Sequence, residues 1–304
     1  MLDISELTLL LPTLLGLSIA GTLIGIISSM TGIGGGLLAV PLLMYGLGLT
    51  NPIASAISSL VIVLTSSSGG YSYWRQKRID LRTGFYFASI AIPMAFVGGI
   101  IADNADVYII TIFWGCFLSF VAVWKISSFL PGNRRKKAPS SPLEAPDVED
   151  SAANNEARSL IPKNIETRTI IDAEGEGFTY MIRFRQVLLG AVLGGFLGGL
   201  FGVGGGVIYV PVLMWGGVPP HIAMATSTFA IVFASASGST ARILGGNVIY
   251  EYVLGLGIGT VIGANIGAKK ARKVSSRGIL AMFYAILLFT GIYTVAEALF
   301  KVKV

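Results

Sequence analysis

A glycine-rich segment that occurs twice constrains this chain more than any other feature of its sequence. Residues 32–44 read GIGGGLLAVPLLM and residues 202–214 read GVGGGVIYVPVLM, so four glycines, a valine, a proline and a methionine recur at identical spacing. Glycine adopts backbone dihedrals that other residues avoid, so such a cluster between apolar runs predicts backbone that leaves the helix. Inside a membrane, this backbone persists only where protein covers it or a cavity hydrates it.

The composition is that of a polytopic membrane protein. Hydrophobic residues make up 53% and charged residues 12% of the 304 residues, whereas roughly 25% are charged in soluble domains. Several apolar runs of about twenty residues are long enough to cross a bilayer as helices. We therefore expect an all-α polytopic membrane protein embedded in the lipid bilayer of the cell membrane.

The scarcity of metal-binding side chains excludes several kinds of site. The chain has one cysteine, Cys116, and one histidine, His221. An intramolecular disulfide and a Cys/His metal site are therefore not expected, and we expect no cofactor. The net charge of +6 is compatible with nucleic-acid binding. However, the basic residues lie at the ends of apolar segments, as membrane topology requires, so we expect no nucleic-acid partner.

The chain divides into two similar halves around a polar segment. We expect a first transmembrane repeat at 1–130, a cytoplasmic linker at 131–185 and a second transmembrane repeat at 186–304. Each repeat should contain one glycine-broken re-entrant or hairpin helix and three spanning helices. The linker is rich in Pro, Ser, Ala, Glu and Asn, so it should be largely disordered. Near its end, 168–172 and 178–182 are candidates for a small β-hairpin.

The charged loops predict that the two repeats have opposite orientations. Basic residues in short loops mark the cytoplasmic side of a membrane. In the first half, 75–82 is basic and 103–106 is acidic, whereas in the second half the equivalent loop at 242–251 is nearly uncharged and 269–277 is basic. This pattern places both termini outside and the two basic loops, with the linker, in the cytoplasm. We therefore expect inverted-topology repeats.

Two helix breaks that meet from opposite sides predict a binding site for a small anion. Inverted repeats with interrupted helices are typical of transporters, which bind substrate near the middle of the membrane. The N-terminus of a helix carries partial positive charge, and glycine N–H groups are not obstructed by side chains. We expect a small oxyanion between the two breaks. The glycines expected to contact it are Gly32, Gly34, Gly35, Gly36, Gly202, Gly204, Gly205 and Gly206.

The helix that follows each break is rich in hydroxyl side chains, which can replace water around an oxyanion. After a one-residue deletion in the preceding turn, Ser58-Ser59 aligns with Ser227-Thr228, and Ser66 aligns with Ser235. The hydroxyl residues expected to bind the substrate are Ser58, Ser59, Ser66, Thr226, Ser227, Thr228 and Ser235. These hydroxyls can equally form helix–helix hydrogen bonds, and the glycines can equally serve close helix packing.

Four further residues are candidates for structural or gating roles. Pro41 and Pro211 follow the breaks and should disturb the helices that begin there. Arg75 and Arg242 both end the hydroxyl-rich helices. Anchoring of their side chains at the membrane interface is the alternative interpretation for the arginines.

The doubled motif carries a family resemblance. The paired G-[IV]-G-G-G-x-x-x-V-P segments, the Ser/Thr-rich helices and the linker between two four-element halves resemble the TauE/SafE family of sulfite exporters. The resemblance covers nearly all of the chain outside 131–185. It implies an integral membrane permease for sulfite or related sulfur anions such as organosulfonates. The family's motif residues fall on Gly32, Gly34, Gly35, Gly36 and Pro41, and on Gly202, Gly204, Gly205, Gly206 and Pro211.

We therefore expect a secondary transporter that exports sulfite or a related small sulfur anion. No Walker motif is present, which argues against an intrinsic ATPase. The inside-negative membrane potential favours the exit of an anion by about 2.3 kcal/mol per charge per 100 mV, so a facilitated route can suffice for export. Import or channel activity with an organosulfonate or sulfate, coupling to a proton and homo-oligomerisation stay open.

The sequence also bears on two other classes of function, a membrane-embedded enzyme and a membrane scaffold. A membrane-embedded enzyme needs a convergent set of His, Asp, Glu, Lys or Cys side chains, and the apolar runs contain almost none of these. We therefore expect no enzymatic activity. A non-transporting membrane scaffold has no need of two matching breaks, but a degenerate transporter can serve as one.

Overall fold

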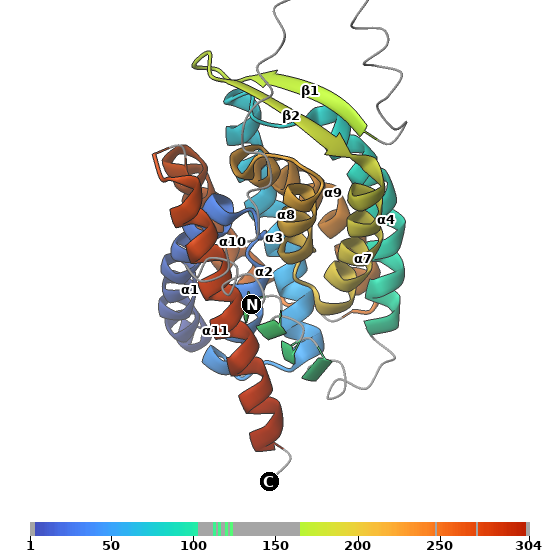
Figure 1. Cartoon of the computed structure of the whole chain (residues 1–304). Helices are drawn as coiled ribbons and strands as arrows, with labels where there is room; N and C mark the ends of the chain where they lie inside the picture. The colour runs from blue at the N-terminus through green and yellow to red at the C-terminus, as the bar shows by residue number, and fades with distance from the viewer. Residues whose placement is uncertain are drawn as a thin grey trace, which may run out of the picture.

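The protein is a bundle of long helices with a small β-hairpin across one end (Figure 1). The computed structural model describes 4–102, the pairs 112–113, 115–116, 119–120 and 122–123, and 165–301 except 247 and 272. The predicted acidic loop at 103–106 and most of the predicted linker, 131–164, lie outside these residues.

Seven helices within the described residues are long and apolar enough to cross a membrane. This confirms the prediction of a mostly helical, multi-pass membrane protein. The seven are α1 (Ile4–Thr31), α3 (Asn51–Arg75), α4 (Leu81–Ala102), α7 (Phe184–Phe201), α9 (Pro220–Leu244), α10 (Tyr250–Ala271) and α11 (Ser276–Lys301).

Both predicted helix breaks are present. The first separates α1 from the short helix α2 (Gly36–Pro41), which continues as a π-helical turn, η1 (Leu42–Gly46). The second separates α7 from α8 (Gly206–Trp215). Pro41 is the last residue of α2, where the backbone changes to the π-helical turn, whereas Pro211 lies inside α8 and the helix continues past it.

The breaks have matching backbone conformations, which explains their glycines. The first three glycines of each motif have positive φ angles between 66° and 93°. Side chains on L-residues rarely adopt this region, so glycine is required there. These residues are Gly32, Gly34, Gly35, Gly202, Gly204 and Gly205.

Helices from the two halves of the chain pack against each other through glycines. In α10, Gly259, Gly263 and Gly267 recur every four residues, and a Cβ at each would collide with the backbone of α1. In α7, Gly195 and Gly199 lie on Ala91 and Ala95 of α4 in the same way. Small residues at this spacing let membrane helices approach closely. The pairs α1–α10 and α4–α7 therefore join the two halves.

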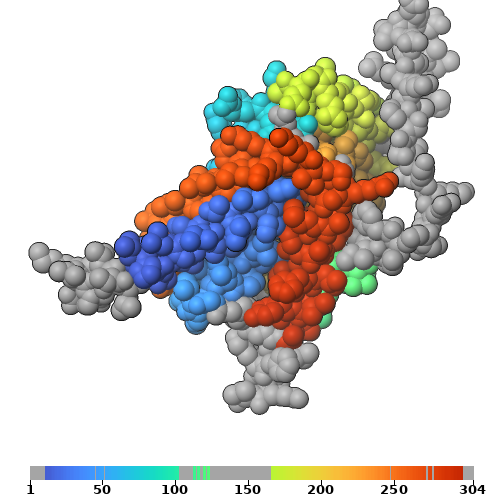
Figure 2. Space-filling view, turned by 90° about the vertical axis from the view of Figure 1, so that its left-hand side faces the viewer, coloured from blue at the N-terminus to red at the C-terminus, as the bar shows by residue number. Residues whose placement is uncertain are grey.

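The outer faces of these pairs are apolar. Figure 2 shows α1 (blue), α10 (orange) and α11 (red) side by side on one face of the molecule. On α1, Leu11, Leu15, Ile19 and Leu23 are each 59–68% exposed and recur every four residues, so they form one stripe along the helix. Such a stripe suits contact with lipid tails rather than with water.

The helix directions bring the breaks together. Helix α7 starts directly after the hairpin and runs away from it. Helix α1 runs parallel to α10, since Ser18 contacts Gly255 near the start of α10 and Ile26 contacts Gly267 near its end. That end of α10 lies beside α3 near the hairpin, where Gln76 Nε2 donates to Ala268 O at 3.2 Å. Helices α1 and α7 therefore approach the centre from opposite ends.

The predicted hairpin is present at the end of the linker. Strands β1 (Ile165–Ile171) and β2 (Gly177–Arg183) pair antiparallel, with Arg168 opposite Tyr180. Asp172 Oδ1 accepts the N–H groups of Glu174 and Glu176 and so fixes the turn. The all-α description therefore omits a two-stranded sheet. In addition, α7 begins at Phe184, two residues inside the predicted linker.

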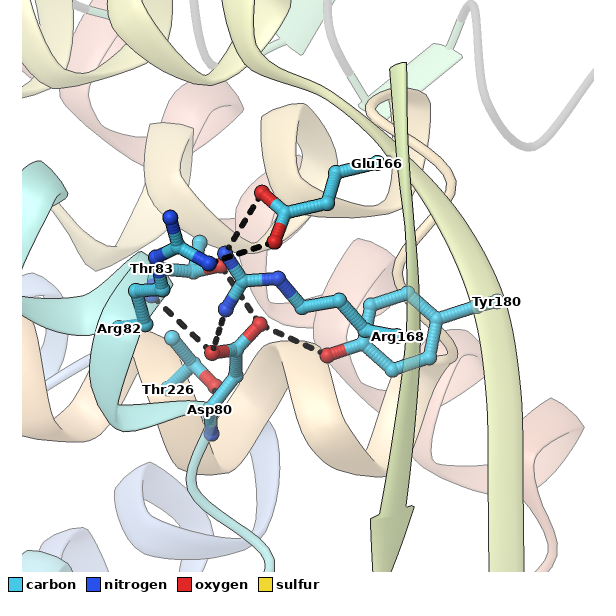
Figure 3. Close-up of polar contacts among 7 residues, drawn as sticks. All are labelled: Asp80, Arg82, Thr83, Glu166, Arg168, Tyr180 and Thr226. Atoms are coloured by element: carbon cyan, nitrogen blue, oxygen red, sulfur yellow. Dashed lines mark hydrogen bonds and ion pairs between the residues drawn. The ribbon is translucent and has the colours of Figure 1, made fainter. Parts of the chain in front are cut away.

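A buried carboxylate attaches the hairpin to the helices (Figure 3). Asp80, which precedes α4, accepts hydrogen bonds from Arg168 Nη1 at 2.8 Å, Tyr180 Oη at 2.8 Å and Thr83 Oγ1 at 2.6 Å. Its own N–H donates to Thr226 Oγ1 at 3.1 Å. Burial, and then the charge of Asp80, raises the pKa of Tyr180, so this hydroxyl stays protonated and donates.

A second buried ion pair lies nearby. Arg78 Nη2 is 2.7 Å from Asp172 Oδ2, and both side chains are almost fully buried. Backbone contacts continue the attachment, because the N–H of Arg183 donates to Gly216 O at 2.9 Å after α8. The hairpin thus joins the α3–α4 loop to the start of α9 and the end of α8.

We expect Asp80→Asn to lower the melting temperature of the purified protein strongly. Removal of one partner from a buried ion pair costs about 3–5 kcal/mol, because the other charge stays buried. Glu176→Gln is the matched control. The Glu176 carboxylate lies 3.5 Å from Arg78, but its side chain is 63% exposed, so its loss should lower the free energy of unfolding by at most about 1 kcal/mol. Equal shifts for the two variants, measured by tryptophan fluorescence in detergent, would contradict the structural role of Asp80.

Candidate functional site

The two glycine breaks touch each other through their backbones. A Cβ at Gly36 would lie 2.6 Å from Val203 Cα and 2.9 Å from Gly202 O. In the opposite direction, a Cβ at Gly206 would lie 2.6 Å from Gly32 O. The last glycine of each motif therefore permits this contact, because any side chain would hold the breaks apart. The structure brings together the two segments that the sequence singled out.

Serines from the two hydroxyl-rich helices bind the breaks reciprocally. Ser58 Oγ of α3 donates to Gly202 O at 3.1 Å, and Ser227 Oγ of α9 donates to Gly32 O at 3.0 Å. Ser58 and Ser227 are equivalent in the alignment of the two halves. Each serine thus satisfies a carbonyl that the end of a helix leaves without a partner. Ser58 and Ser227 therefore form hydrogen bonds between helices, which was the alternative to substrate binding for these hydroxyls.

Three other predicted hydroxyls are also occupied within the protein. Ser59 Oγ donates to Ala56 O and Thr228 Oγ1 to Met224 O, both at 2.8 Å within their own helices. Thr226 accepts the Asp80 N–H near the hairpin and so does not bind a break.

Two predicted hydroxyls, Ser66 and Ser235, are buried and have no hydrogen-bond partner among the described residues. Ser235 lies at the second break, since a Cβ at Gly204 would be 3.0 Å from its Oγ. These two hydroxyls therefore keep their capacity to bind a ligand, unlike the other hydroxyls in the predicted set.

The breaks also hold backbone donors. Within the described part of the chain, no acceptor is found for the N–H groups of 34–36 or 204–206. Such N–H groups at the start of a helix carry partial positive charge. Both breaks therefore retain the feature that predicts anion binding.

An apolar pair separates these donors at the centre of the molecule. Ile62 of α3 and Ile231 of α9 are fully buried, and both contact the positions where Gly34 and Gly204 lack a side chain, at 2.9–3.3 Å from an ideal Cβ. The two isoleucines are equivalent in the alignment of the halves. They cover the second glycine of each motif.

A small cavity lies beside the second break. Its volume is about 10 Å³, close to the roughly 10–15 Å³ that a single water molecule needs. Glycines and hydroxyls dominate the lining, which contains one cation and no carboxylate. The lining residues are Ser59, Ala95, Gly195, Gly198, Gly199, Gly202, Gly204, Tyr209, Ala234, Ser235, Gly238 and Arg242.

Arg242 is the cation of this cavity. Its side chain is buried, and Nη2 donates to Gly199 O and Leu200 O, both at 3.0 Å. These carbonyls end α7, where the helix dipole is negative, so they hold the guanidinium in place. Arg75, which the sequence grouped with Arg242, is instead exposed at the end of α3.

The position in the first half equivalent to Arg242 is Tyr73. Its hydroxyl donates to Ser29 O at 2.7 Å, and Ser29 is the equivalent of Gly199. The side chains of Tyr73 and Arg242 therefore bind equivalent carbonyls, each in the broken helix of its own half. The contact is shared by the two halves, but only the second half places a charge there.

Tyr209 is a functional candidate that sequence reasoning missed. It is fully buried, lines the cavity and has no hydrogen-bond partner for its hydroxyl among the described residues. Its ring packs on Phe87, with centroids 4.4 Å apart. The signal was available: the motif reads Tyr-Val-Pro at 209–211 where the first copy reads Ala-Val-Pro at 39–41.

Comparisons with known proteins agree with these features. The family model described as "Sulfite exporter TauE/SafE" matches residues 17–294. The chain is 29% identical to "Probable membrane transporter protein YunE" of Bacillus subtilis, over 94% of this chain and 98% of that protein. It is 24% identical to "Probable membrane transporter protein MJ0441" of Methanocaldococcus jannaschii, over 95% and 96% of the two chains.

A plant relative matches over a smaller region. The chain is 26% identical to "Sulfite exporter TauE/SafE family protein 6" of Arabidopsis thaliana, over 47% of this chain and 34% of that protein. No solved structure matches the chain.

We expect Gly36→Ala and Gly206→Ala each to prevent the two breaks from packing. The added methyl group would meet backbone atoms of the opposite break, which cannot move aside as a side chain can. Gly16→Ala in α1 is the control, because a Cβ there has no neighbour within 4 Å. Gel filtration should show loss of the monodisperse peak for the first two variants only. A normal peak and melting temperature for both would contradict the tight contact of the breaks.

Proposed function

The chain belongs to the TauE/SafE sulfite exporter family, whose members are membrane transporters and not enzymes, and we propose that it exports sulfite or a related small sulfur anion. The observation that carries the proposal is the contact of two glycine breaks beside a buried, cation-containing cavity. Unpaired backbone donors are costly inside a membrane and are characteristic of substrate sites in transporters.

The chemistry of the site supports an anion as substrate. A charged ion that leaves water needs compensating charges and hydrogen-bond donors in the protein. The N–H groups of the breaks, the free hydroxyls and Arg242 are all donors, and no carboxylate lines the cavity to repel an anion. Binding through fixed backbone donors also avoids a large excess of charge in the membrane.

The helix arrangement supports two inverted-topology repeats, 1–130 and 186–304, as part of this proposal. Helices α1 and α7 run in opposite directions to the centre, and Ser58 and Ser227 make equivalent bonds to the opposite breaks. The packed pairs α1–α10 and α4–α7 each join one helix of the first repeat to one helix of the second, as an inverted arrangement predicts. The connecting segment 131–185 is then a cytoplasmic linker that ends in the hairpin.

Each of the pairs α1–α10 and α4–α7 contains one helix from each repeat. Movement of one pair against the other would open the anion site to each side of the membrane in turn. Glycine packing makes α1–α10 and α4–α7 tight units, and the breaks join them at the centre. The cavity of about 10 Å³ has room for about one water, so this conformation is closed. An anion then enters when Ile62 and Ile231 separate from the breaks. The membrane potential favours outward movement of the anion by about 2.3 kcal/mol per charge per 100 mV.

Flux assays in proteoliposomes test the proposed function. We expect saturable, protein-dependent flux of radiolabelled sulfite, with sulfate and a simple alkyl sulfonate as further probes. Gly35→Leu and Gly205→Leu should abolish flux, because a side chain is strained at their positive φ angles and, at Gly205, would also meet the ring of Tyr209. Gly16→Leu is the matched control, since that position is open. Absence of protein-dependent flux for every anion would overturn the proposal.

Cysteine labelling tests the proposed orientation. In a Cys116→Ala background, a single cysteine replaces either Lys77, after α3, or Leu244, at the end of α9, both of which are exposed. We expect a membrane-impermeant maleimide to label position 244 in intact cells and position 77 only after permeabilisation, because the basic loop faces the cytoplasm. The reverse pattern would mean that the chain has the opposite orientation.

A further inference from the structure

We propose that the second break alone provides the charged part of the anion site, with Arg242, Tyr209 and Ser235 as the side chains that bind the anion's oxygens. This inference rests on the proposed function, because it names the residues and the class of ligand for that site. It predicts that the two halves have the same helix arrangement but contribute unequally to anion binding.

The two free hydroxyls are the first argument. Tyr209 and Ser235 are 0% and 4% exposed, and neither hydroxyl has a hydrogen-bond partner among the described residues. A buried hydroxyl without a partner destabilises a protein, so folding alone gives no reason to keep two of them on one cavity. A ligand that accepts both hydrogen bonds does give such a reason.

The position of the cation is the second argument. Arg242 lines the same cavity and stays charged at any physiological pH. Its Nη2 atom is fixed by the carbonyls that end α7, so the guanidinium does not have to be ordered when the ligand binds. The cavity lining also includes Gly202 and Gly204 of the break itself, so the backbone of the break lies at the same place.

The first half lacks the cation and the tyrosine of this arrangement, although Ser66, the equivalent of Ser235, also has a buried hydroxyl without a partner among the described residues. Ala39 stands where the second half has Tyr209, and neutral Tyr73 stands in place of Arg242. Ser28 and Ser29 replace the cavity glycines 198 and 199, and their Oγ atoms lie about 3 Å from where a Cβ would be at Gly35 and Gly69. The positions beside the first break therefore carry serine hydroxyls in place of the tightly packed glycines of the second half.

The donor set selects a class of ligand. Hydroxyls, a guanidinium and backbone N–H groups all donate, so the ligand must present several acceptor oxygens. The lining contains no carboxylate that would bind an ammonium group. The site therefore suits a small oxyanion such as sulfite or sulfate, and it disfavours a zwitterion such as 2-aminoethanesulfonate.

Tyr209→Phe and Ser235→Ala provide the sharpest test. Each removes a hydroxyl that has no partner within the described structure, so the unliganded protein should melt at the same temperature as the wild type or higher. We expect the affinity for sulfite, measured by anaerobic calorimetry on the purified full chain, to fall about tenfold or more, since hydrogen bonds to charged groups are lost. 2-Aminoethanesulfonate should bind the wild type more weakly than sulfite.

The matched control is Tyr73→Phe at the equivalent position of the first half. It removes the hydrogen bond to Ser29 O, so it should lower the melting temperature but change sulfite affinity less than about twofold. Arg242→Gln should lose sulfite binding, with partial recovery in Arg242→Lys. If Arg242→Gln does not fold, the two hydroxyl variants decide the question.

Two outcomes separate the two proposals. Protein-dependent flux in the wild type, with unchanged sulfite affinity in folded Tyr209→Phe and Ser235→Ala, would overturn this inference and leave the transport function intact. Equal loss of affinity in Tyr73→Phe would also overturn it. A wild-type protein that neither binds nor transports any anion would instead overturn the proposed function.

Discussion

Backbone contact between the two glycine breaks is the constraint on which the rest of the structure depends. Each break leaves peptide groups without helical partners in the middle of a membrane protein, where such groups are costly. These groups are tolerated because each break covers the other at Gly36 and Gly206. In addition, Ser58 and Ser227 donate to carbonyls that have no helical partner. The opposite directions of α1 and α7 and the exchange of α4 and α10 between halves follow from the need to bring the breaks together.

Much of this arrangement was predictable from sequence, because glycine clusters and apolar runs are local signals. The breaks, the seven spanning helices of the described residues and a hairpin, predicted at 168–172 and 178–182, were anticipated from composition and spacing. The roles of individual side chains were not. Ser227 and Thr226 are neighbours in the sequence, yet one binds the first break and the other binds Asp80 beside the hairpin. Such partners lie about 150–200 residues away along the chain, and spacing alone does not identify them.

The arginines illustrate the same limit. The sequence pattern grouped Arg75 with Arg242 because both end a hydroxyl-rich helix. In the alignment of the halves, however, Arg75 lies two positions beyond the equivalent of Arg242. Arg75 is exposed, whereas Arg242 is buried and lines the cavity. Helical periodicity turns a shift of two residues into opposite faces of the helix. The alignment of the halves, continued along α3 and α9, pairs Arg242 with Tyr73 instead, and the shared bond to the end of the preceding helix supports that pairing.

The strength of the contacts differs between the hairpin end and the centre, and this difference bears on movement. Buried ion pairs at Asp80 and Asp172 hold the hairpin to the helices, and loss of one partner from such a pair is strongly destabilising. The breaks are instead held by a few neutral hydrogen bonds, worth about 1 kcal/mol each, and by the contact of Ile62 and Ile231. An anion that binds the free donors of the second break can compensate for the loss of a few such bonds. It cannot compensate for the loss of the ion pairs, so we infer that the helices part at the breaks while the ion pairs of the hairpin stay intact.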